Sequence, residues 1–201
     1  MTAQQPDSYF YQSEKYSYIA SKGKHISATF HPGDYGITPA SICTNCYAGY
    51  FCEFQVLHGK LLLQTLQINS KENKYPAING VLPLLPNDAP GYQGYHVYEN
   101  LTLPMDYTGS LILGKGFLNK YYIHTGFQHA WSYKNVIELI FKDGQLVEQH
   151  DYSDLIERLR QEKALEIQTY TENWSSTPHP FKLGRGRSFF GFMKTPWWIK
   201  R

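Results

Sequence analysis

Alternating apolar and polar residues occur in two parts of the chain, each with a two-residue turn at its centre. The turns are His58-Gly59 and Asp143-Gly144. The flanking runs are residues 50–57 with 60–68, and residues 136–142 with 145–150. A glycine-containing pair between such runs is typical of a β-hairpin, because the turn needs residues that tolerate positive φ. The pattern therefore predicts two hairpins.

Weaker patterns predict further strands. Residues 111–113 and 117–124 suggest the two strands of a third hairpin, in which Gly114-Lys115-Gly116 forms the turn. Residues 25–30 resemble a short strand. Alternating tyrosines near the N-terminus suggest an edge strand. They are Tyr9, Tyr11, Tyr16 and Tyr18.

A long irregular segment separates the first hairpin from the later strands. Residues 69–103 contain several prolines and glycines, and residues 95–98 are the only short strand expected there. We expect the segment to pack on the rest of the protein, because it carries apolar side chains. These are Val81, Leu82, Leu84 and Leu85.

One amphipathic helix is predicted from Ser153 to about Gln168, with Ser153 as the N-cap and Asp154 at the positive end of the helix dipole. The 3-to-4 spacing assigns two faces to this helix. The packed face holds Leu155, Ile156, Leu159 and Lys163, and the solvent face holds Glu157, Arg158, Arg160 and Glu162.

These elements predict an α+β fold, with a mainly antiparallel twisted sheet built from hairpins and one amphipathic C-terminal helix packed on it. The 16% aromatic content favours the same class, because Tyr and Phe suit half-buried sheet surfaces. We expect one mainly-β domain over residues 1–175, followed by a basic aromatic segment over residues 176–201 that packs on the domain.

Charge is distributed unevenly along the chain. Residues 176–201 hold six Lys and Arg residues and no acid, whereas the preceding residues hold 13 basic against 17 acidic side chains. Such a tail suits an anionic partner or an acidic surface of the domain itself. Cations neutralise phosphates, and aromatic rings stack on unpaired bases. The candidate binding residues are Arg185, Arg187, Phe189, Phe190, Trp197 and Trp198.

Three cysteines and a histidine resemble part of a zinc site. Cys43 and Cys46 have the spacing of one half of a tetrahedral site. The other half is incomplete, because Cys52 lies in a predicted strand and His58 in a predicted turn. A catalytic redox pair would need a helix N-terminus at Cys43, and the flanking sequence predicts none. We therefore expect no metal, with these three cysteines as the only candidates.

His124 and His129 form the most catalytic-looking cluster, with His150 and the Tyr121-Tyr122 pair near it in the expected fold. A histidine can act as a general base because its usual pKa lies close to neutrality. No Asp or Glu lies at a sequence spacing that would identify it as a catalytic partner of either histidine, so the sequence leaves open whether they act in catalysis.

Cofactor and membrane motifs are missing from the sequence. The glycines of residues 109–116 match neither the phosphate-binding loop nor the dinucleotide fingerprint, and Ser110 does not lie in a nucleophile elbow. We expect no cofactor. The chain has no apolar run of membrane-spanning length and no secretory signal at its start, so we expect a cytoplasmic protein.

Three classes of function are compatible with these features. The first is a non-enzymatic protein-interaction module, such as an inhibitor or an immunity-type protein, that binds a partner protein through a tyrosine-rich surface. The 17 tyrosines support it, because interfaces are enriched in Tyr, Trp and Arg. The second is a small enzyme or ligand-binding domain with a histidine-containing pocket. The third is nucleic-acid binding through the basic aromatic tail.

Overall fold

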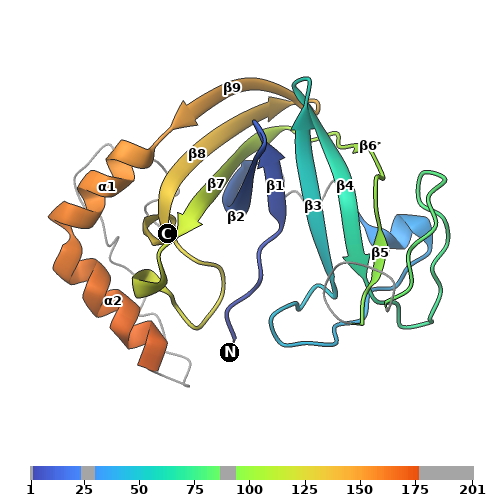
Figure 1. The fold of residues 1–201 in the computed structure, drawn as a ribbon, viewed down its shortest axis with the longest axis horizontal. Helices are drawn as coiled ribbons and strands as arrows, with labels where there is room; N and C mark the ends of the chain where they lie inside the picture. Colours follow the sequence, from blue (N-terminus) through green and yellow to red (C-terminus); the bar gives the residue numbers. More distant parts are fainter. Residues whose placement is uncertain (1, 24–29, 87–93, 177–201) are drawn as a thin grey trace.

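The computed structural model describes residues 2–23, 30–86 and 94–176 and shows a sheet-rich α+β fold (Figure 1). Its nine strands form one mostly antiparallel, mixed sheet, as the sequence predicted for the fold class. The strands are β1 (Ser8–Tyr11), β2 (Glu14–Gly23), β3 (Tyr50–Leu57), β4 (Lys60–Ile68), β5 (His96–Tyr98), β6 (Leu103–Pro104), β7 (Gly109–Phe117), β8 (Tyr133–Lys142) and β9 (Gln145–Asp151).

The sheet curves until its pairings form a closed circuit. The strands follow one another in the order β3-β1-β2-β7-β8-β9-β4, and β4 pairs again with β3. The β1–β3 pairing is parallel, and the other pairings are antiparallel. The circuit closes where β9 meets β4 at Gln145 and Lys60. Strands β6 and β5 also pair with β4, farther along it at residues 62–63 and 66–68.

Both predicted two-residue hairpins are confirmed. His58 and Gly59 have φ of 48° and 74°, and Asp143 and Gly144 have φ of 48° and 73°. Positive φ at both central residues defines the turn type whose twist matches that of the flanking strands. The first turn joins β3 to β4, and the second joins β8 to β9.

The predicted turn at Gly114-Lys115-Gly116 is wrong. These residues lie inside β7, which continues to Phe117 and pairs with β8. A Cβ atom on Gly114 would lie 2.5 Å from the ring of Tyr133 and 2.8 Å from Ile19 Cδ1. Glycine is therefore needed here for close packing within the sheet.

The N-terminal tyrosines do not form an edge strand. Strands β1 and β2 form a hairpin of their own, and β1 lies between β2 and β3. Tyr9 and Tyr18 are buried in the interior core. The strand predicted over residues 25–30 falls almost wholly outside the described residues.

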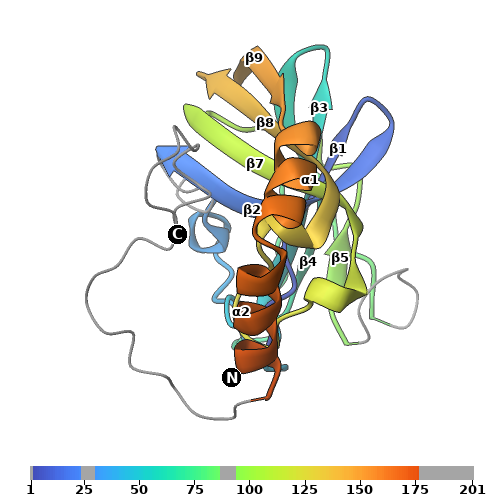
Figure 2. The ribbon, with the colours of Figure 1, turned by 90° about the vertical axis from the view of Figure 1, so that its left-hand side faces the viewer.

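Two hydrophobic clusters lie on the two faces of the sheet. The inner cluster fills the concave side and includes Phe54, Leu111 and Phe141. The outer cluster joins Ile112 and Val136 of the sheet to apolar side chains from the helical segment. Figure 2 shows this segment from its own side.

The sequence predicted one helix here, and the structure has two, α1 (Ser153–Glu162) and α2 (Ala164–Ser176). They are separated at Lys163, which has φ of −114° and ψ of 23°. Ile156 and Leu159 of α1 and Ile167 of α2 belong to the outer cluster.

Two details of the predicted helix are also wrong. Ser153 is the first helical residue, and Tyr152 occupies the N-cap position. The backbone N–H of Ser153 donates to Asp151 Oδ1 at 2.8 Å. Its hydroxyl instead accepts from the Val136 N–H. Arg160 does not face water, because its side chain is only 7% exposed and donates to the carbonyl oxygens of Trp131 and Tyr133.

Candidate functional site

The structure gives the two candidate catalytic histidines different environments. His124 is exposed, and its Nδ1 lies 3.0 Å from the Tyr122 hydroxyl. His129 stacks on Trp131 with ring centroids 4.2 Å apart, and its Nε2 lies 3.1 Å from the Tyr170 hydroxyl. His129 therefore belongs to an aromatic cluster beneath α2.

Burial lowers the pKa of His129 to about 4, so this imidazole is neutral near pH 7. A general base works best when its pKa lies near the working pH. His150, which the sequence placed near the same cluster, pairs with Glu148 at 3.0 Å on β9. Glu138 accepts a hydrogen bond from Tyr152 instead of approaching either candidate histidine.

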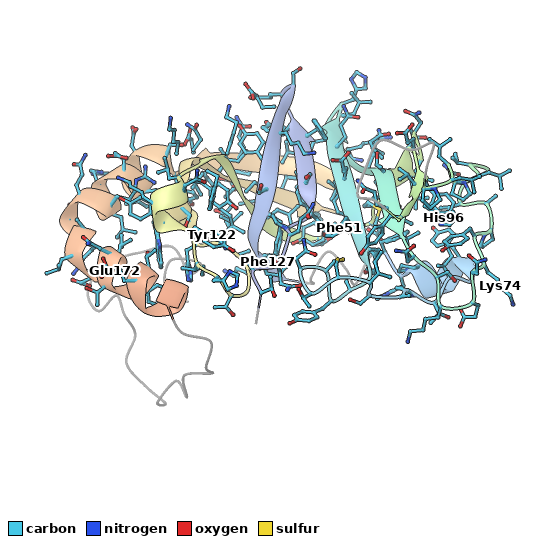
Figure 3. All side chains as sticks on the ribbon, turned by 60° about the horizontal axis from the view of Figure 1, so that its bottom comes forward. Phe51, Lys74, His96, Tyr122, Phe127 and Glu172 are labelled. Carbon is cyan, nitrogen blue, oxygen red and sulfur yellow. The ribbon has the colours of Figure 1, made fainter. Side chains whose placement is uncertain are left out.

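The three cysteines divide between two clusters. Cys43 and Cys46 pack with Phe51 and Tyr95, whereas the buried Cys52 belongs to the inner core. Phe51, labelled in Figure 3, packs on Tyr95 with ring centroids 5.5 Å apart. Neighbouring residues of a strand face opposite sides of the sheet, which accounts for the separation of Cys52. His58 lies in the β3–β4 turn, away from both clusters.

Within the described residues, no group of three or more His, Cys, Asp or Glu side chains is arranged to hold a metal ion. The Cys43 Sγ lies 3.4 Å from the Tyr95 hydroxyl, and the Cys46 thiol also interacts with that hydroxyl. Cys46 additionally donates to the Tyr50 carbonyl oxygen.

Asp7 is a titratable group that sequence reasoning missed. Its carboxylate accepts a hydrogen bond from the Cys52 N–H at 2.9 Å, just before β1 begins. Burial raises the pKa of this carboxyl to about 6, although the hydrogen bond opposes the shift. Nothing in the local sequence of a single Asp signals this burial, because it depends on the parallel pairing of β1 with β3.

A surface hollow of about 720 Å³ lies beside the first turns of α1. Lysines from one wall and carboxylates from the other give it a mixed charge. These charged residues include Lys120, Lys134, Asp154 and Glu157. Neither candidate histidine lines the hollow.

An apolar loop at the opposite end of the molecule is the most unusual surface feature. Leu82, Leu84 and Leu85 are 70%, 39% and 59% exposed. We call residues 81–85 the leucine loop; it belongs to the green connection beyond β5 at the right of Figure 1. The segment packs on the protein as expected, through residues such as Ile78 and Val81, but the three leucines that suggested this packing are exposed.

The backbone of the leucine loop is held at both ends. Ile78 and Val81 exchange two backbone hydrogen bonds of 3.0 and 2.9 Å across a turn at Asn79-Gly80. Leu84 exchanges two more with Val97 of β5, at 2.8 and 3.2 Å. The leucines are therefore presented on an anchored backbone.

Most of the described tyrosines pack in the hydrophobic clusters. Six are buried and seven more are partly buried against the clusters, whereas Tyr47 and Tyr122 are 62% and 38% exposed. The buried tyrosines are Tyr9, Tyr18, Tyr95, Tyr98, Tyr107 and Tyr133. A high tyrosine count therefore does not by itself locate an interface in this chain.

The tail candidates Arg185, Arg187, Phe189, Phe190, Trp197 and Trp198 lie outside the described residues. Of the helices in the described ranges, none is both long and apolar enough to cross a membrane. No family model, curated protein or solved structure matches the chain. The fold and its surface features thus define a sheet-rich α+β protein with an exposed apolar loop.

Proposed function

We propose that this protein is a non-enzymatic protein-interaction module that binds a partner protein through the leucine loop. The observation that carries the proposal is the outward projection of Leu82 and Leu85 from an anchored backbone. Large apolar side chains gathered on one surface are typical of interaction sites.

The anchored backbone favours binding for an entropic reason. A segment that is already ordered loses less conformational freedom when it meets its partner. The four hydrogen bonds at Ile78–Val81 and Leu84–Val97 supply this order before binding. The partner that fits is a protein with an apolar groove that receives the leucine side chains.

The histidine environments support a non-enzymatic function over the enzyme alternative. The His129 ring is stacked on Trp131, with its Nε2 directed to Tyr170, and its pKa lies well below neutrality. These contacts suit a residue that holds the helical segment to the sheet.

The experiment is quantitative capture of binding proteins from native lysate, with the partner then purified and its Kd measured. The test variant is Leu82→Ser combined with Leu85→Ser. Leu165→Ser is the matched control, because Leu165 is 77% exposed at the start of α2. Burial of one leucine contributes about 1.5–3 kcal/mol, so the double variant should weaken binding by about 100-fold or more.

The proposal fails if the purified partner binds the double variant as tightly as it binds the unmodified protein. It also fails if Leu165→Ser weakens binding as much as the double variant does. Circular dichroism of each variant confirms that a loss of binding does not come from unfolding.

The hollow beside α1 supports ligand binding as a second candidate function. Lys120 and Lys134 suit an anionic group, and Asp154 and Glu157 suit a cationic group, so a small zwitterion matches the lining. A screen of free amino acids and related zwitterions by thermal shift tests this, with Lys134→Met expected to abolish any stabilisation. A screen without a hit removes this candidate.

Nucleic-acid binding through the tail is the third candidate, and the charge of residues 176–201 favours it. Affinity for single-stranded oligonucleotides should fall steeply with salt. It should be lost when residues 177–201 are deleted. Binding that persists after this deletion would assign it to another surface.

A further inference from the structure

The loop that carries Cys43 and Cys46 has the geometry of a disulfide site. The Cys46 N–H donates to the Cys43 carbonyl oxygen at 3.4 Å, which closes a four-residue turn. Such a turn brings its first and last Cα atoms within about 7 Å. Disulfides usually join Cα atoms about 4.4–6.8 Å apart, so the backbone already lies near the required separation.

The side chains also converge. The Cys43 Sγ lies 3.4 Å from the Tyr95 hydroxyl, and the Cys46 thiol interacts with the same oxygen. Both cysteines are free thiols in this structure. Cys43 is only partly buried, so an oxidant in solution can reach it, whereas Cys46 is buried behind it.

Cys52 does not share this geometry. Its side chain is 3% exposed and lies in the inner core, apart from the cluster of Cys43, Cys46 and Tyr95. It therefore provides an internal control for thiol chemistry that depends on the loop.

The two residues between the cysteines hold the N-terminal segment in place. The Asn45 carbonyl oxygen accepts from the Gln5 N–H at 3.0 Å, and the Thr44 carbonyl oxygen accepts from the Gln4 side chain at 3.0 Å. The Gln4 side chain in return accepts from the Tyr47 N–H at 3.2 Å. Every one of these bonds depends on the conformation of the loop.

The N-terminal segment also reaches the loop that bears the candidate histidines. The Gln4 N–H donates to the Gly126 carbonyl oxygen at 2.8 Å, and Ala3 and Gly126 form a parallel bridge. Residues 2–5 therefore connect the cysteine loop to the segment between His124 and His129.

We propose that Cys43 and Cys46 form a reversible disulfide within this loop, and that its formation releases residues 2–5 from the loop. The oxidant is a hydroperoxide. The Cys43 sulfur attacks one peroxide oxygen, the O–O bond breaks, and a sulfenic acid and one water (or alcohol) form. The Cys46 sulfur then attacks the Cys43 sulfur, the S–O bond breaks, and the second water leaves with the thiol proton.

The release follows from the geometry of the thiols. Both sulfurs now contact the Tyr95 hydroxyl, and a disulfide would place them about 2.05 Å apart. A disulfide has no S–H group, so the hydrogen bond from Cys46 to the Tyr50 carbonyl oxygen is lost and the loop is free to shift, whereas Tyr95 stays buried against Phe51. Movement of Thr44 and Asn45 shifts the two carbonyl oxygens that hold Gln4 and Gln5.

Burial raises the pKa of the Cys46 thiol, and this affects the rate at which Cys46 attacks the sulfenic acid. Thiolates attack much faster than thiols, so the second step should be slow near neutral pH. The pair therefore suits a stoichiometric response to oxidant rather than repeated catalytic turnover.

The test treats the full-length protein with hydrogen peroxide and maps disulfides by mass spectrometry. The same samples are examined by hydrogen exchange. We expect a Cys43–Cys46 disulfide that dithiothreitol reverses. Exchange of the Gln5 backbone amide should accelerate about tenfold or more on oxidation, since it loses its hydrogen bond to the Asn45 carbonyl oxygen.

Three variants separate the outcomes. Cys52→Ser should behave like the unmodified protein, whereas Cys43→Ser and Cys46→Ser should show no change in exchange with peroxide. If the two loop cysteines stay reduced or become only sulfinic acids in the folded protein, the site is wrong. If the disulfide forms while exchange at the Gln5 amide stays constant, the proposed release is wrong.

Discussion

The two ends of the long axis of the molecule differ in how they expose leucine side chains. At the helical end, Ile156 and Leu159 are buried in the outer cluster, and Leu165 is a single exposed leucine. At the other end, Leu82 and Leu85 extend into solvent from the leucine loop. Figure 3 shows the separation of the two ends, with Glu172 at the helical end and Lys74 and His96 at the other.

The helical end also buries a charged group. Arg160 is almost fully buried and hydrogen-bonded to backbone carbonyl oxygens. A buried charge that is removed from water needs such partners, because unpaired burial is costly. The contacts at the helical end therefore stabilise the fold, whereas Leu82 and Leu85 contribute little buried surface to it.

The β3–β4 and β8–β9 hairpins meet at their two turn glycines, and a substitution at this junction should have a large effect on stability. Leu61 N–H donates to the Gly144 carbonyl oxygen at 2.9 Å, and Leu146 N–H donates to that of Gly59 at 2.7 Å. A Cβ atom on Gly144 would lie 2.4 Å from the Met105 carbonyl oxygen, whereas one on Gly59 would meet nothing within 4 Å.

Gly144→Ala should therefore lower the free energy of unfolding by about 3–4 kcal/mol, from backbone strain and overlap together. Gly59→Ala has the same positive φ without the overlap, and it should cost about 1–2 kcal/mol. Urea denaturation of both variants gives the difference. Equal losses would show that the Met105 contact does not limit the turn.

Arg160 provides the next largest effect, at the helical end. Arg160→Met should lower the free energy of unfolding by about 2–3 kcal/mol, because two carbonyl oxygens lose a charged donor. Arg158→Met is the matched control, since Arg158 is exposed on the same helix and should change stability by less than about 0.5 kcal/mol. A neutral Arg160→Met would mean that the contact contributes no net stability.

The pH dependence of stability distinguishes His129 at the helical end from Asp7 near the middle of the sheet. Burial lowers the pKa of His129 to about 4 from a usual value of 6.5. Between these values the unfolded chain binds more protons, so this group makes stability fall as pH drops from about 6.5 to about 4.

Asp7 acts in the opposite direction, because burial raises its pKa from 3.8 to about 6. The folded protein binds more protons between these values, so this group makes stability fall as pH rises from about 4 to about 6. Asp7→Asn should therefore make stability rise more steeply with pH in this window, and His129→Gln should make the rise shallower. Urea midpoints at several pH values test both slopes, and unchanged slopes would contradict the two shifts.

Local sequence was sufficient where local chemistry decides the structure. The His58-Gly59 and Asp143-Gly144 turns need only residues that tolerate positive φ, and both hairpins were predicted correctly. Gly114 and Gly116 also suggested a turn from the sequence, but both lie within a strand. Gly114 is needed there because a Cβ atom would overlap the ring of Tyr133 across the β7–β8 pair. That contact depends on sheet pairing, which local patterns do not specify.

The same reason explains two errors about which side chains are exposed. The helical period placed Arg160 toward water, but the carbonyl oxygens of Trp131 and Tyr133 lie within its reach in the folded protein. The apolar character of Leu82 and Leu85 suggested packing, although their loop is anchored through its backbone. Hydropathy predicts which residues favour burial, but it does not show which ones the fold has room to bury.

The smallest expected effect on stability is therefore at the leucine loop. Leu82→Ser combined with Leu85→Ser should change the free energy of unfolding by no more than about 0.5 kcal/mol, because both side chains are already largely in water. Leu159→Ala at the helical end removes a buried leucine and should cost about 2–5 kcal/mol. Urea denaturation measures both. A loss above about 1 kcal/mol in the loop variant would show that the leucines stabilise the fold, and their exposure would then no longer support a binding function.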